Sequence, residues 1–461
     1  MQTTKCNYIT LYFLVLLPLL LGLSACKKYL EAPSDKSLVV PTTLDDMQAM
    51  LDYNSILNTI EPVMSEVASD NYYLKAANYS NLNINVRNNY AWAPKAEYLY
   101  DWTGAYTVVL YGNVILDNID RIQKDAANTT RWNTIKGSAL FFRAHAFYNV
   151  AGQFCKAYTP TTAAEDLGIV LRLSSDVNAP SVRSSMAESY ARIIEDLKQA
   201  ASLLPLTTAY LTRPDKAAAY GDLARTYLVM GDYQSALLYA DSCLMLHPAV
   251  LDFNDLNPAL AGPVPSFNAE VIFHTTTGGV TALAQNAARV DSVLYDSYEE
   301  NDLRKSIFFK TNSDGTHAFK GTFDGTFTPG KSACFTGLTS GEMLLVKSEC
   351  LARLGQGDQA LSTLKTLMDL RFKRGTYTTP VVSSADDALL LILNERRKEL
   401  IFRSRRWQDL KRLNKEARFA TTLTRVIGDQ VYTLAPNDSR YAMLIPSSVI
   451  GLSQIPQNSR P

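Results

Sequence analysis

Tyrosine and tryptophan are concentrated in one stretch of the chain. Ten of the 41 residues 71–111 are Tyr or Trp, and no Phe occurs between Phe13 and Phe141. Aromatic residues that carry a polar atom are typical of partly wet surfaces. Their flat faces can stack on the apolar C–H faces of sugar rings, while Asn, Asp and Arg hydrogen-bond the hydroxyls. We expect a ligand-binding surface formed by Asp70, Asn71, Tyr72, Asn81, Arg87, Tyr90 and Trp92.

Packing inside a core is the alternative role for these aromatic residues. Trp102, Tyr106 and Asn113 fit the beginning of a packed helix, and we assign them to that role. For Tyr72, Tyr90 and Trp92, the sequence leaves both the core and the binding role open.

Residues that would support catalysis are sparse. His145, His247, His274 and His317 are scattered and form no pair with metal-ligand spacing, and the chain has no GxSxG motif. Residues 325–332 match GxxxxGK[ST], but they lack the preceding buried strand and the following helix that a phosphate loop needs. The sequence therefore predicts no enzyme activity, no metal site and no cofactor.

The charge balance narrows the class of partner. The 461 residues contain 45 Lys and Arg and 45 Asp and Glu, so no global positive charge attracts nucleic acid.

Residues 394–412 are locally basic, with eight basic and three acidic residues. Glu399 and Arg403 stand four apart with the acid first, which supports a helix. We interpret this segment as a structural ion-pair helix rather than a site for nucleic acid or anionic sugar.

The N-terminus has the features of an export signal. Residues 8–23 are apolar but too few to span a bilayer comfortably, and they end in Leu23-Ser24-Ala25-Cys26. This ending resembles the lipobox of bacterial lipoproteins, in which cleavage precedes the Cys and its thiol is lipidated. The resemblance implies a signal peptide at 1–25, lipidation of Cys26 and a tether at 26–45, although an ordinary secretory signal is the alternative.

Four cysteines remain in the mature chain, and none forms a CxxC pair. We expect Cys155, Cys243, Cys334 and Cys350 to be buried free thiols, with a single disulfide as the open alternative.

The elements that must position these residues are mainly helices. Apolar residues recur at helical spacing in 106–122, 132–158 and 186–204. Residues 217–250 match the tetratricopeptide pattern, and residues 342–371 are a weaker copy. Because one helix pair cannot bury its own apolar face, several pairs must stack. The sequence predicts a mainly α fold, a single domain at 46–461 with tetratricopeptide-like hairpins near 106–158, 186–250 and 341–371.

Two loop-rich insertions interrupt this scaffold, at 71–105 and 251–340. The second contains Asp314-Gly315 and Asp324-Gly325, which are typical of hairpin turns. Loops on a rigid scaffold commonly carry binding sites, so both insertions are candidate binding regions.

Several separate motifs resemble landmarks of the SusD/RagB family of Bacteroidetes outer-membrane lipoproteins, and the similarity extends over the mature chain. These motifs are Trp102-x3-Tyr106-x6-Asn113, Arg143-Ala144, Glu342-x2-Leu345-x3-Glu349, Ile392-x2-Glu395-Arg396-x2-Glu399-Leu400-x-Phe402, Arg406-Trp407-x-Asp409-Leu410-x-Arg412, Leu444-Ile445-Pro446 and Gln457-Asn458. The chain departs from the family pattern at Thr339, at Arg403-Ser404 and at Ser459-Arg460-Pro461.

The resemblance implies a non-enzymatic scaffold at the cell exterior, held in the outer membrane by lipid at Cys26. Such a protein binds oligosaccharide and delivers it to a SusC-like TonB-dependent transporter. A peptide- or protein-binding tetratricopeptide lipoprotein without glycan specificity is the alternative. The ligand residues of the family vary between members, so the candidate site above rests on the aromatic residues alone.

Overall fold

The computed structural model describes residues 40–325 and 332–460. Residues 1–39, with the predicted signal peptide, Cys26 and most of the tether, lie outside the described residues, as do residues 326–331 of the GxxxxGK[ST] match. The α-helices are α3 (Leu44–Leu51), α4 (Asn54–Leu57), α5 (Met64–Val67), α6 (Ala76–Ser80), α7 (Ile84–Tyr90), α8 (Leu99–Ile119), α9 (Thr129–Phe154), α10 (Met186–Leu203), α11 (Lys216–Met230), α12 (Tyr233–Leu246), α13 (Ser292–Asp296), α14 (Arg304–Phe308), α15 (Ser340–Arg353), α16 (Gly357–Met368), α17 (Ala385–Glu399), α18 (Arg406–Leu413) and α19 (Ser447–Ser453). Three 3₁₀ helices span Phe253–Asp255, Thr281–Leu283 and Ser439–Tyr441.

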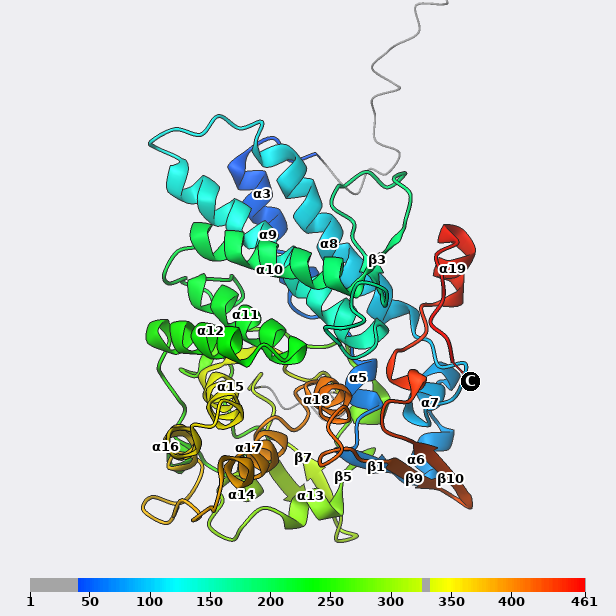
Figure 1. Ribbon diagram of the computed structural model, residues 1–461, viewed down its shortest axis with the longest axis vertical. Helices are drawn as coiled ribbons and strands as arrows, with labels where there is room; N and C mark the ends of the chain where they lie inside the picture. Colours follow the sequence, from blue (N-terminus) through cyan, green and yellow to red (C-terminus); the bar gives the residue numbers. More distant parts are fainter. Residues whose placement is uncertain (1–39, 326–331, 461) are drawn as a thin grey trace, which may run out of the picture. The chain divides into compact units, whose positions relative to one another are not determined.

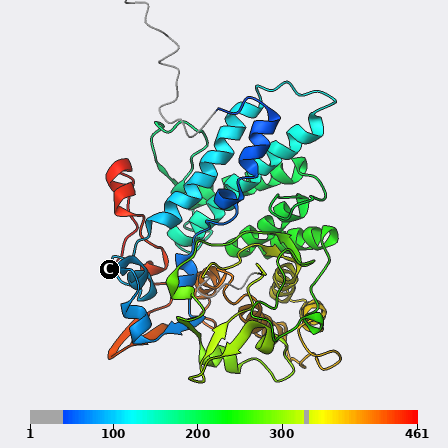
Figure 2. The same ribbon diagram turned by 180° about the vertical axis from the view of Figure 1, so that it is seen from behind.

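The long helices stack in chain order. α8 packs on α9, α9 on α10, α10 on α11 and α11 on α12, after which α12 packs on α15 and α15 on both α16 and α17. Figure 1 shows this succession from α8 to α17, and the view from behind shows the same order of layers (Figure 2). The prediction of a mainly helical, tetratricopeptide-like scaffold is confirmed.

The α11–α12 hairpin shows how local sequence produces this repeat. Gly231 ends α11 with a φ of 79°, a left-handed conformation that glycine adopts without steric cost. The Asp232 carboxylate then accepts a hydrogen bond from the backbone N–H of Ser235 and so caps α12, which begins at Tyr233. Tyr227 and Tyr239 stack with their ring centres 5.6 Å apart, and Ala236 is fully buried, so the two helices approach closely.

The strands form two-stranded antiparallel sheets throughout the described residues. They are β1 (Tyr72–Leu74) with β5 (Ala288–Val290), β2 (Leu167–Val170) with β3 (Arg183–Ser185), β4 (Val271–Phe273) with β8 (Leu338–Thr339), β6 (Phe309–Thr311) with β7 (His317–Phe319), and β9 (Leu423–Ile427) with β10 (Gln430–Leu434). In the first sheet, Tyr72 lies opposite Val290. This pairing brings the two loop-rich insertions together.

The basic segment 394–412 is structural, as the sequence indicated, but through different partners. The Glu399 carboxylate pairs with Arg304 and Arg371 at 3.2 and 2.9 Å. The predicted helical pair of Glu399 with Arg403 does not form, because α17 ends at Glu399 and Phe402 has a φ of 54°. Arg406 and Arg412 pair with Asp70 and Glu349, carboxylates that lie far away in the sequence.

Cys155, Cys243, Cys334 and Cys350 are buried and unbridged, which confirms the prediction of free thiols. Over the part of the chain that is described, no helix is long and apolar enough to cross a membrane.

Candidate functional site

Asp70 and Asn71 are occupied by contacts within the protein. Both oxygens of the Asp70 carboxylate accept hydrogen bonds from the Arg406 guanidinium, at 2.7 and 2.9 Å, and Arg397 lies 3.2 Å away. Burial alone would raise the pKa of Asp70, but the two guanidinium groups hold it well below its usual range. The buried Asn71 amide donates to Glu66 at 2.9 Å. These two side chains therefore fix the local fold.

Tyr72, Tyr90 and Trp92 do not form an exposed aromatic surface. Their exposed fractions are 3, 1 and 3%, and they surround the guanidinium of Arg425, which lies 3.6 Å from the centre of the Tyr90 ring. The Trp92 indole N–H donates to the carbonyl of Ala68 at 2.9 Å.

The hydroxyl groups of the two tyrosines also form hydrogen bonds within the protein. The Tyr72 hydroxyl donates to the Val67 carbonyl, and the Tyr90 hydroxyl accepts from the Leu74 N–H. Of the two roles that the sequence left open for these three rings, their burial supports the core role. A core site prefers Tyr and Trp to Phe here because their polar atoms satisfy buried backbone groups.

Asn81 and Arg87 are the remaining predicted site residues. Asn81 is exposed directly after α6, and Arg87 is partly buried in α7. Their role in ligand binding stays a prediction.

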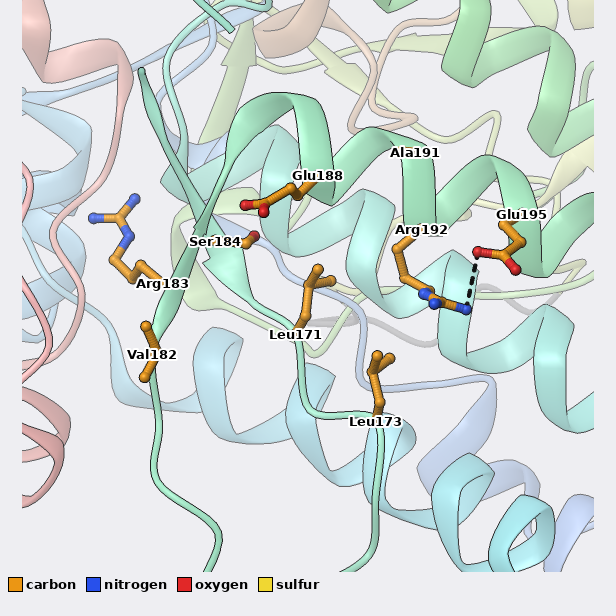
Figure 3. Close-up of a pocket in the computed structure, with 9 residues that line it drawn as sticks. All are labelled: Leu171, Leu173, Val182, Arg183, Ser184, Glu188, Ala191, Arg192 and Glu195. Atoms are coloured by element: carbon orange, nitrogen blue, oxygen red, sulfur yellow. Dashed lines mark ion pairs between the residues drawn. The ribbon is translucent and has the colours of Figure 1, made fainter. Parts of the chain in front are cut away.

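One surface hollow lies between α10 and the loop from β2 to β3, with a volume of about 490 Å³. Figure 3 shows Leu171 and Leu173 on the loop and the Arg192–Glu195 ion pair, 3.2 Å long, on the helix. Its lining contains no aromatic ring. This hollow therefore offers no flat face for stacking a sugar.

A second hollow lies in the 251–340 insertion and is lined by aromatic and polar groups. Its volume is about 630 Å³, and we call it the aromatic cleft. The side chains of Tyr295 and His317 stack face to face, with ring centres 3.4 Å apart and an interplanar angle of 9°. The lining residues are Pro258, Ala259, Tyr295, Glu300, Asp302, Leu303, Lys305, Ser306, Phe309, Thr311, His317 and Lys373.

Local structure brings the stacked pair together. Tyr295 lies on α13, whose first turn is held by the Asp291 carboxylate accepting from the N–H of Leu294. His317 begins β7, opposite Thr311 of β6, and the predicted turn at Asp314-Gly315 joins the two strands with Gly315 at a φ of 78°. Phe309 packs edge-on against Tyr295 and fixes its ring.

The polar groups of the aromatic cleft suit hydrogen bonding to a neutral ligand. Glu300, Ser306, Thr311 and Lys373 are exposed, and Lys305 lies 5.0 Å from the centre of the Tyr295 ring. Burial lowers the pKa of His317, so its imidazole is neutral at pH 7.

The Asp302 carboxylate is held by Arg304 at 2.7 Å, which occupies it in an internal ion pair. Within residues 40–325 and 332–460, no cluster of His, Cys, Asp and Glu would hold a metal ion. This arrangement can bind a sugar ring and its hydroxyls.

Comparison with known sequences identifies the family. Residues 28–228 match a SusD-like family described as starch-binding and associating with the outer membrane, and residues 315–445 match the SusD family. The chain belongs to the SusD/RagB family. SusD-like protein P2 of Formosa agariphila is 24% identical over 368 residues, which are 68% of this chain and 71% of that protein.

Solved structures share the fold of this SusD-family chain. A putative sugar binding protein from Bacteroides vulgatus is 19% identical, with a TM-score of 0.74 over 91% of this chain and 99% of the other. A SusD superfamily protein from Bacteroides thetaiotaomicron is 22% identical, with a TM-score of 0.72 over 91% and 100%.

The motifs that carry the family resemblance build the scaffold. Glu342 pairs with Arg225, Glu349 with Arg412, and Arg396 with Asp409, and all six side chains are buried. Tyr295 and His317 were not among the predicted site residues. The available signal was a histidine two residues after the predicted turn at Asp314-Gly315, within an insertion that was a candidate binding region.

Proposed function

We propose that this SusD-family chain binds oligosaccharide in the aromatic cleft at the cell exterior and delivers it to a SusC-like TonB-dependent transporter. The stacked Tyr295–His317 pair carries the proposal, because it combines a rigid aromatic group with surrounding hydrogen-bonding side chains. Family membership and the fold shared with a putative sugar binding protein support it.

The proposal includes lipidation at Cys26, which would tether the helical scaffold to the outer membrane. The proposal also holds that the chain binds the oligosaccharide and does not hydrolyse it. The aromatic cleft offers one free carboxylate, Glu300, whereas Asp302 is consumed by Arg304. Glycoside hydrolysis generally uses two carboxylates that flank the scissile bond.

The test is native gel electrophoresis of the mature protein through gels that contain individual polysaccharides. A glycan that binds should retard the wild type, and Tyr295→Ala with His317→Ala should restore its mobility. Tyr210→Ala is the matched control, because Tyr210 is 59% exposed and does not line the aromatic cleft. If the double variant is still retarded, the glycan-binding site lies outside the aromatic cleft. Binding of peptides alone, across a broad glycan panel, would favour the peptide-binding alternative.

Transport requires a separate measurement. Purification of the lipidated chain from its own outer membrane in mild detergent should recover a TonB-dependent barrel in equimolar amount. Recovery of the chain alone would count against the transporter partnership while leaving the glycan proposal standing.

A further inference from the structure

A third hollow lies where α9 ends against α18, and it is rich in lysine. Its volume is about 510 Å³, and it shares no lining residue with the aromatic cleft. We call it the lysine cleft. Its lining residues are Lys156, Ala157, Thr159, Thr162, Asp166, Lys411, Lys415, Asn437, Asp438, Ser439, Tyr441 and Ala442.

Lys411 is a buried cation without an anionic partner. The residue is 6% exposed, and its ammonium donates to the carbonyls of Gly152 and Cys155 at the end of α9. Among the described residues, no carboxylate forms an ion pair with it. An ammonium has three N–H donors, so one remains after these two hydrogen bonds.

The helix end compensates the Lys411 charge only in part. The carbonyl end of a helix carries about half a negative charge. Burial lowers the pKa of Lys411 to about 8, which reflects this incomplete compensation. A buried ammonium is stabilised most strongly by a full negative charge.

The other charges of the lysine cleft leave a positive excess. Asp166 pairs with Lys156 at 3.1 Å, and Asp438 pairs with Arg440 at 2.7 Å, so both carboxylates already have a cation. Lys415 donates to the carbonyl of Tyr158 at 2.6 Å and, in the part of the chain that is described, has no ion pair. The ammonium groups of Lys411 and Lys415 are therefore the unneutralised charges of this cleft.

Neutral donors complete the lining. The Ser439 and Thr159 hydroxyl groups lie in the same cleft, and hydroxyl groups bind anionic oxygens well. Charge-assisted hydrogen bonds from ammonium groups to an oxyanion are about twice as strong as neutral ones.

We propose that the lysine cleft binds a carboxylate or sulfate group of an acidic oligosaccharide, with Lys411 and Lys415 as its cationic donors. That the anionic group is carried by a sugar rests on the proposed function. The site itself rests on the cleft and its charges. The chain then distinguishes acidic from neutral glycans at a place separate from the aromatic cleft.

The test is isothermal titration of the full mature chain with four probes. They are a uronic-acid oligosaccharide, a sulfated oligosaccharide, a neutral oligosaccharide of the same length, and inorganic sulfate. We expect at least one acidic oligosaccharide to bind about tenfold more tightly than the neutral one, which corresponds to about 1.4 kcal/mol. Equal affinities for acidic and neutral oligosaccharides would overturn the proposal.

Two variants locate the binding. Lys411→Met keeps most of the apolar stem and removes the charge, and Lys415→Gln removes the charge of an exposed residue and keeps a side-chain N–H donor. Each should reduce the preference for the acidic probe about tenfold. Lys365→Gln is the control, because Lys365 pairs with Asp369 on the surface of α16 and does not line the cleft. An unchanged preference in Lys415→Gln would refute the assignment even if Lys411→Met failed to fold.

Two further outcomes separate this inference from the proposed function. Tyr295→Ala with His317→Ala should abolish neutral binding and leave the inorganic sulfate affinity intact. Equal affinity for inorganic sulfate and for the sulfated oligosaccharide would overturn the assignment to a sugar-borne group.

Discussion

His145 supports a prediction of pH-dependent stability. This side chain on α9 is 2% exposed, and its ring nitrogens lie 2.6 Å from Asp222 of α11 and 2.6 Å from Glu61. Burial alone would lower the pKa of His145, but the two carboxylates outweigh it and raise the pKa from 6.5 to about 9.

The magnitude follows from the shift in pKa. A rise from 6.5 to about 9 corresponds to about 3 kcal/mol, because each unit is worth about 1.4 kcal/mol. The folded state binds the proton more tightly than the unfolded state. The stabilisation is therefore fully present below pH 6.5 and is lost as the pH rises through 9.

The assay compares the wild type with His145→Gln by urea unfolding at several values from pH 6 to pH 10. The wild type should exceed the variant in free energy of unfolding most strongly at pH 6, and the difference should shrink by about 3 kcal/mol by pH 10. Lys411 also titrates in this range, with its pKa lowered to about 8, so its contribution rises with pH. Both proteins carry Lys411, and the difference between them isolates His145.

His317→Gln is the matched control for this measurement. Burial lowers the pKa of His317 below its ordinary value, so its imidazole is neutral in both the folded and the unfolded state at the alkaline end of the range. The difference between the wild type and this variant should stay constant above pH 7. A difference between the wild type and His145→Gln that also stays constant would refute the assignment of a charged, doubly paired imidazole.

Three further substitutions test the packing. Trp92→Phe leaves the Ala68 carbonyl without its indole donor and should lower the free energy of unfolding by about 1–3 kcal/mol, whereas unchanged thermal stability would contradict its core role. Gly231→Ala should cost about 1 kcal/mol in calorimetry because φ is positive, and a neutral result would mean that the turn relaxes. Arg304→Met leaves Glu395 buried without its main cation and should cost about 3–5 kcal/mol or prevent folding, and a chain of normal urea stability would refute this.

The helical scaffold was predictable because its signals are local. The tetratricopeptide pattern of residues 217–250 lies within one hairpin, in which Gly231 ends α11 and Asp232 caps α12. The first long helix of the stack begins at Leu99 rather than near Tyr106. Helix ends depend on tertiary contacts that no local pattern records.

The role of the aromatic stretch was not predictable from composition. Arg425, which the rings of Tyr90 and Trp92 surround, lies 335 residues after Tyr90, and no local pattern joins them. A tyrosine in a wet surface and a tyrosine whose hydroxyl satisfies a buried backbone group look the same in sequence.

The aromatic cleft shows a similar limit. The turn at Asp314-Gly315 could be predicted from the sequence. The stacking of His317 on Tyr295 could not, because it depends on the pairing of β6 with β7 and on how this hairpin packs beside α13. The basic segment was correctly interpreted as structural, yet its partners Asp70, Arg304 and Glu349 come from three other regions of the chain.

The most direct test of the account is a crystal structure of the mature chain with the oligosaccharide that binds most tightly in the gel assay. We predict a sugar ring within about 4 Å of the Tyr295 or His317 ring, with its hydroxyls bonded to Glu300, Ser306 or Lys373. A sugar bound instead on the surface of α6 and α7, beside Asn81 and Arg87, would contradict the assignment of the aromatic cleft.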